Sequence, residues 1–160
     1  MRVLSLVRHA KSDRRVDVPD RERPLSARGE HAAPAMARRW IGLGLVPDRI
    51  LTSPAVRAHQ TALLFAGEFG LAPASIELDE RLYLASPGEL LEAIHDTPAR
   101  TRHLMVFGHN PGISALARML YPDLPFAELP TAAACTVTSS ARSWSRVEDG
   151  TILLVACEQP

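Results

Sequence analysis

The sequence predicts an α/β fold of three layers, α/β/α, with a mainly parallel central sheet and one antiparallel edge strand. Short apolar runs alternate with amphipathic segments up to about residue 120, which is typical of this class. The run His103–Phe107 is almost entirely apolar, as expected of a strand covered by helices on both faces. Beyond residue 120 two apolar runs flank a polar turn, which favours an antiparallel pair.

Six segments are predicted as strands because they are short, apolar and bounded by turn-forming residues. They are Val3–Val7, Arg49–Thr52, Ser75–Leu78, His103–Phe107, Ala134–Thr138 and Thr151–Cys157. Helices are predicted between them. The first follows Ser26, a favourable N-cap residue, and runs to about Gly42. The others are Ala55–Phe69, Gly88–His95 and Ile113–Leu120.

Length and composition limit the number of domains and the kinds of partner that we expect for this protein. A chain of 160 residues favours a single domain, 1–160, because it can bury a core without dividing. The formal net charge is zero, so we expect neither nucleic acid nor an anionic membrane as partner. No apolar run approaches the roughly 18 residues of a membrane span, and we expect a cytoplasmic protein. Cys135 and Cys157 could pair, but a reducing compartment favours two buried thiols.

Ionisable residues follow each of the first four predicted strands. Arg8 and His9 follow the first, Arg57 falls in the first helical turn after the second, Glu80 ends the third, and His109 follows the fourth. Each alone could be a surface charge or a structural histidine. Ligands of parallel sheets bind beyond the carboxyl ends of the strands, so together these residues predict a site at that edge. We expect the charged loop from residue 11 to 23 to form its rim.

This set of side chains suits phosphoryl transfer, in which catalysis is mostly positioning and charge stabilisation. Arg8, Arg57 and His109 offer donors to the phosphoryl oxygens. A neutral His9 can act as nucleophile, and nearby guanidiniums would lower its pKa toward that form. We expect burial to raise the pKa of Glu80, so that it is protonated and donates to the leaving group.

The motifs "LVRHAKS", "SPAVRAHQTA", "LDERLY" and "GHNPG" resemble, in order and spacing, the histidine phosphatase (phosphoglycerate mutase-like) superfamily from about residue 3 to 120. The short length and "RPLSARG" look most like its SixA-type phosphohistidine phosphatase branch. The resemblance implies a hydrolase without a metal or other cofactor. It also implies that His9 is transiently phosphorylated, that Arg8, Arg57 and His109 hold the phosphoryl group, and that Glu80 is the acid.

Two further phosphate contacts, Ser12 and Asn110, are expected beside these residues. The sequence also departs from the family pattern at two positions. Ala10 stands where the family usually has glycine, so we expect an ordinary backbone conformation there. Lys11 stands where many relatives have glutamate, which bears on substrate preference.

The substrate is predicted from what could cover the pocket. Only about twenty residues separate Leu82 from His103, and no insertion there could form a roof. An open pocket favours phosphohistidine on a protein, such as a histidine-phosphotransfer domain, over a small phosphorylated substrate. The alternatives are a small-molecule phosphomonoesterase or mutase of the same fold and, in a different class, a catalytically silent phospho-binding module.

Overall fold

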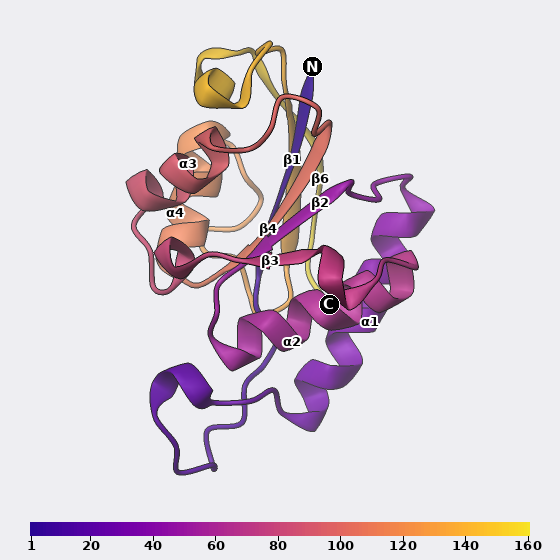
Figure 1. The fold of residues 1–160 in the computed structure, drawn as a ribbon, viewed down its shortest axis with the longest axis vertical. Coiled ribbons are helices and arrows are strands. Elements are labelled where there is room, and N and C mark those ends of the chain that lie inside the picture. The colour runs from indigo at the N-terminus through magenta and orange to yellow at the C-terminus, as the bar shows by residue number, and fades with distance from the viewer.

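The computed structural model describes all of residues 1–160 and contains one six-stranded sheet with the strand order β3-β2-β4-β1-β5-β6 (Figure 1). The strands are β1 (Arg2–Arg8), β2 (Arg49–Thr52), β3 (Ile76–Leu78), β4 (His103–Gly108), β5 (Ala134–Ser139) and β6 (Ile152–Glu158). The α-helices are α1 (Ala27–Gly42), α2 (Val56–Phe69), α3 (Pro87–His95) and α4 (Gly112–Leu120). Each predicted element is present, with ends within two residues of those expected.

The sheet is mainly parallel, as predicted. Strand β4 pairs in parallel with both β1 and β2, and β2 pairs in parallel with β3. Strand β5 is antiparallel to both β1 and β6. The α/β fold class is therefore confirmed. The reversed strand β5 lies one position inside the sheet, because β6 pairs along its outer side.

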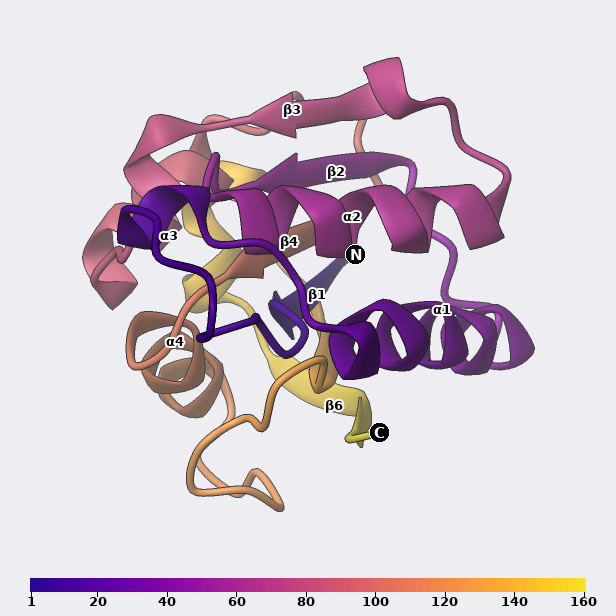
Figure 2. The same cartoon turned by 90° about the horizontal axis from the view of Figure 1, so that it is seen from below.

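Helices α3 and α4 cover one face of the sheet and α1 and α2 cover the other, which gives the three layers (Figures 1 and 2). On one face Leu4 and Leu6 of β1 belong to a core cluster with side chains of α3 and α4. On the other face Val7 belongs to a second cluster with Trp40 of α1 and Phe65 of α2. Neighbouring residues of β1 point to opposite faces, so a single strand contributes to both cores.

The four parallel strands end at one edge of the sheet. Arg8, the last residue of β1, lies beside Gly108 of β4, and Thr52 of β2 lies beside both Phe107 and Leu78. The loop after β1 therefore starts at the same edge as the loops after β2, β3 and β4. Figure 2 views the molecule from this side.

The expectation of two free thiols is wrong. Cys135 and Cys157 lie directly opposite each other in the register of β5 and β6 and form a disulfide. The antiparallel register brings the two sulfur atoms together, which the spacing in the sequence does not reveal. None of the helices combines the length and apolar character that a membrane crossing requires.

The start of α1 packs directly on the backbone that follows His9. The Ser26 side chain accepts from the Gly29 N–H at 3.2 Å, as predicted for an N-cap, and the Ser26 N–H donates to the Lys11 carbonyl at 2.8 Å. A Cβ on Gly29 would lie 2.2 Å from the Lys11 carbonyl oxygen. Only glycine permits this approach, so Gly29 holds the first residues of the loop against the helix.

We predict that Gly29→Ala lowers the free energy of unfolding by about 1–3 kcal/mol, because a backbone atom rather than a flexible side chain must move. Gly67→Ala is the matched control, since nothing lies within 4 Å of a Cβ at that position in α2. The control should raise the free energy of unfolding by about 0.5–1 kcal/mol, the usual gain over glycine inside a helix. Urea denaturation measures both, and equal effects would contradict the close packing of α1 on Lys11.

Candidate functional site

A cavity of about 220 Å³ lies at the carboxyl edge of the sheet. Its lining is polar and includes five cationic side chains, with Leu84 as the single hydrophobic residue and Asp20 as the single carboxylate. The structure brings together six of the seven predicted site residues in this lining and leaves Glu80 outside it. The six are Arg8, His9, Ser12, Arg57, His109 and Asn110.

His9 directly follows β1 and is only 8% exposed. Its Nδ1 lies 2.8 Å from the Ala10 carbonyl, which can only accept, so Nδ1 carries the proton and Nε2 a lone pair. Arg57 Nε donates to that lone pair at 3.3 Å. Burial lowers the pKa of His9 to about 4, and the nearby guanidiniums, Arg57 first, add to the shift. His9 is therefore a neutral imidazole at pH 7, and its Nε2 carries the lone pair that a nucleophile needs.

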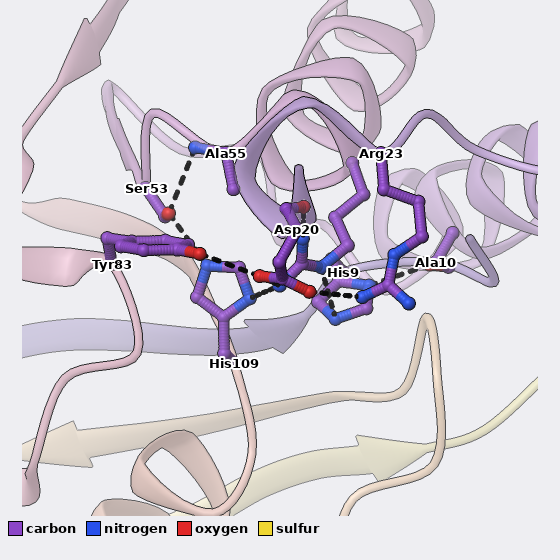
Figure 3. Close-up of polar contacts among 9 residues, drawn as sticks. His9, Ala10, Asp20, Arg23, Ser53, Ala55, Tyr83 and His109 are labelled. Atoms are coloured by element: carbon purple, nitrogen blue, oxygen red, sulfur yellow. Dashed lines mark hydrogen bonds and ion pairs between the residues drawn. The ribbon is translucent and has the colours of Figure 1, made fainter. Parts of the chain in front are cut away.

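His109 follows β4, and its ring centroid lies 5.2 Å from that of His9 (Figure 3). Its Nδ1 is 3.4 Å from Arg57 Nη2, a group that only donates, while its Nε2 lies 2.7 Å from Ser53 Oγ. These contacts put the proton on Nε2. Burial lowers the pKa of His109 to about 3, with His9 and Arg57 adding to the shift. The second imidazole is therefore neutral as well.

Arg57 connects the parts of the site. It lies in the first turn of α2, and its side chain is only 3% exposed. Besides the two imidazoles it contacts Asp20, donating from Nη1 to the backbone carbonyl at 2.7 Å and from Nη2 to the carboxylate at 3.0 Å. Thr61 accepts from the Ala10 N–H at 3.0 Å and donates to the Arg57 carbonyl at 2.6 Å, which ties α2 to the end of β1.

Asp20 is a site residue that the sequence did not reveal. It begins a short 3₁₀ helix (Asp20–Glu22) in the loop predicted to form the rim. Its carboxylate accepts from Tyr83 and Arg23, both at 2.7 Å, and from Arg57 (Figure 3). The Tyr83 hydrogen bond is the main cause that lowers the pKa of Asp20. The cavity therefore contains an ionised carboxylate, which competes for the same guanidiniums as a phosphoryl group.

The expectation that Glu80 is a buried, protonated acid is wrong. Its side chain is 71% exposed and pairs with Arg21 at 2.5 Å. The hydrogen bond from Arg21 lowers the pKa of Glu80 instead of raising it. The chain turns immediately after β3, so Glu80 lies outside the cavity. Tyr83 instead packs edge-on against the His109 ring, with ring centroids 5.6 Å apart.

The remaining predicted phosphate contacts differ in whether their side chains already form hydrogen bonds within the protein. Asn110 donates to the Leu129 carbonyl at 3.0 Å and accepts from Ser114 at 2.5 Å, so both ends of its amide are engaged within the protein. Ser12 lines the cavity, and its hydroxyl makes no hydrogen bond within the chain. Ala10 has no positive φ, so the expected ordinary backbone there is confirmed.

Two cavity-lining guanidiniums retain unused donors. The Nε atoms of Arg8 and Arg23 are buried and lack a hydrogen-bond partner, while Arg8 Nη1 donates to the Leu129 carbonyl at 2.9 Å. Buried donors are normally paired, so a bound oxyanion that accepts from these two N–H groups would satisfy them. No cluster of three or more His, Cys, Asp or Glu side chains is arranged to hold a metal ion.

A sequence model of the histidine phosphatase superfamily (branch 1) matches residues 4–90. The chain belongs to this superfamily. An uncharacterised protein of Mycobacterium tuberculosis is 36% identical over 164 residues, covering 96% of this chain and 99% of its own. Membership of this superfamily supports a phosphatase activity for the protein.

Solved structures share the fold over almost the whole chain. The protein histidine phosphatase SixA complexed with tungstate is 23% identical, with a TM-score of 0.82, and the match covers 98% of this chain and 96% of that one. Mycobacterial glucosyl-3-phosphoglycerate phosphatase is 18% identical, with a TM-score of 0.68 and coverage of 96% and 97%. At these identities the likeness concerns the fold, and the predicted SixA-like architecture is confirmed.

We predict that Asp20→Asn strengthens competitive inhibition by inorganic phosphate roughly threefold to tenfold. The substitution removes the negative charge that competes for Arg57 and Arg23, and close charges in a partly buried site interact by about 1 kcal/mol or more. Inhibition constants at pH 7 measure the effect. Asp13→Asn is the control, because Asp13 lies in the same loop but pairs with Arg15. Weaker inhibition in Asp20→Asn would contradict the competition.

Proposed function

We propose that the protein hydrolyses phosphohistidine on a protein through a phosphohistidine intermediate on His9. The observation that carries this proposal is the neutral His9 ring with its Nε2 lone pair beside the Arg57 guanidinium. A histidine nucleophile must be unprotonated at the attacking nitrogen, and a phosphoryl group must be held by cations while it transfers. Both conditions are met at the end of β1.

In the first step Nε2 of His9 attacks phosphorus, a P–N bond forms, and the bond from phosphorus to the substrate nitrogen breaks. Arg8, Arg57 and Arg23 donate to the phosphoryl oxygens. The Ala10 carbonyl, which accepts from His9 Nδ1, stabilises the positive charge that develops on the phosphorylated ring. Water then attacks phosphorus, the P–N bond to His9 Nε2 breaks, and both protons of the water leave with inorganic phosphate, so His9 returns to its neutral form with the lone pair on Nε2.

The leaving group decides between the substrate classes. A phosphate ester expels an alkoxide, which needs a proton from a neighbouring acid. Asp20 has a lowered pKa and is ionised, and Glu80 lies outside the cavity, so neither supplies that proton. The ring of phosphohistidine can carry a proton on its other nitrogen and then leaves as neutral imidazole. The absence of a protonated carboxylic acid therefore favours phosphohistidine over a phosphate ester.

The shape and lining of the cavity support the same substrate. Leu84 is its single hydrophobic residue, so there is no apolar wall for a sugar ring or a base. The SixA protein with the similar fold is named a protein histidine phosphatase and was solved with tungstate, a tetrahedral oxyanion like phosphate. The small-molecule phosphatase of the same fold has the lower TM-score, and a phosphomonoesterase remains the second candidate.

Trapping the intermediate tests the proposal. With a ³²P-phosphohistidine peptide, the protein should become labelled on His9, and the label should be labile to acid and stable to base, as expected of a P–N bond. His9→Ala should carry no label, while His31→Ala, which changes an exposed histidine on α1, should be labelled normally. Label that survives acid, or that persists in His9→Ala, would disprove the assignment of the nucleophile.

The same preparation distinguishes phosphohistidine from ester substrates. We expect kcat/KM for the phosphohistidine peptide to exceed that for phosphosugars and phosphoserine peptides by about 100-fold or more, the usual contribution of a general acid that an ester would need. Faster turnover of a phosphosugar would favour the phosphomonoesterase. Phosphate binding without turnover of any substrate would indicate a silent binding module.

A further inference from the structure

Three cations near the catalytic cavity have no partner within the protein. The side chains of Lys11, Arg14 and Arg28 are exposed, and none makes an ion pair or a side-chain hydrogen bond. Arg23 and Arg57, by contrast, both pair with Asp20. The net charge of the chain is zero, so these unpaired cations are a local excess and not the general character of the surface.

A second cavity of about 140 Å³ adjoins the catalytic one. Lys11 and Thr131 line both cavities, and Arg28 lines the second. No Asp or Glu side chain lines the second cavity. The two cavities adjoin at Lys11 and Thr131, and their cations Arg14, Lys11 and Arg28 are called here the basic groove, which leads from the cavity of His9 toward the first turn of α1.

The backbones of Lys11 and Arg28 are fixed relative to each other by contacts between the loop and α1. The Lys11 carbonyl accepts from the Ser26 N–H at 2.8 Å and from the Ser26 hydroxyl at 3.0 Å, and it packs against Gly29. Arg28 belongs to the same first turn of α1. The positions of both backbones are thus determined by the contact between the loop and the helix, which orients the basic groove relative to His9.

We propose that the basic groove binds carboxylate side chains that flank the phosphohistidine of a protein substrate. This inference rests on the proposed function and specifies which phosphoproteins it favours. The cations are exposed and spread over two cavities, so an extended acidic segment can contact them successively. A compact metabolite would bind in one cavity and leave Arg28 without a role. Exposed cations of this kind raise association rates with anionic partners.

Two phosphohistidine peptides of equal length test the inference, one with glutamate and one with glutamine at the flanking positions. The wild-type protein should prefer the acidic peptide by about fivefold to tenfold in kcat/KM, through KM, and the preference should diminish in high salt. Arg28→Glu should abolish this preference and leave the rate with the neutral peptide unchanged, because Arg28 lies outside the catalytic cavity.

Arg142→Glu is the matched control. Arg142 is also exposed and without an ionic partner, but its carbonyl accepts from Arg2 at the start of β1, the end of the strand opposite to His9. This variant has the same change of charge and should keep the wild-type preference. Equal rates with both wild-type peptides, or an equal loss in the Arg142→Glu control, would overturn the inference.

Two other results would also overturn the inference, one by indicating a different ligand and the other by disproving the proposed function. If Arg28→Glu raises KM for a small bisphosphate but not for the acidic peptide, the groove binds a second phosphate of a metabolite. If neither peptide is dephosphorylated by the wild-type protein, the proposed function fails, and this inference fails with it.

Discussion

The guanidinium of Arg57 between two neutral imidazoles is the interaction on which the rest of the site depends. It donates to Nε2 of His9 and to Nδ1 of His109, so each ring must present a lone pair at that atom. Protonation of either ring would put two donors face to face in a buried space. Burial and the positive charge of Arg57 both act against that protonation, which makes the neutral form of His9 a consequence of the fold.

The fold supplies this geometry from distant parts of the chain. Parallel pairing of β1, β2 and β4 brings His9, Arg57 and His109 to one edge, and the hydrogen bonds of Thr61 fix the helix that carries Arg57 to the end of β1. Asp20 then balances part of the concentrated positive charge. A partly neutralised site is easier to fold than an unpaired cluster of buried cations, and it retains guanidinium donors for a phosphoryl group.

The sequence predicted what depends on strand order, and it missed what depends on loop conformation. His9, Arg57 and His109 each lie close to the end of a strand or the start of a helix, so the topology alone brings them together. Asp20 and Glu80 lie where the path of the loop decides which side chain turns inward, and sequence spacing carries no signal for that. The same limit explains the disulfide of Cys135, because the register of an antiparallel pair depends on the turn between the strands.

The tautomers of the two histidines test the central claim most directly. In ¹⁵N-labelled protein, NMR from pH 8 to 5 should show both rings neutral throughout, with the proton of His9 on Nδ1 and that of His109 on Nε2. An unperturbed histidine becomes protonated near pH 6.5 and would change within this range. A His9 ring that is protonated at pH 6, or that carries its proton on Nε2, would contradict the account of the nucleophile.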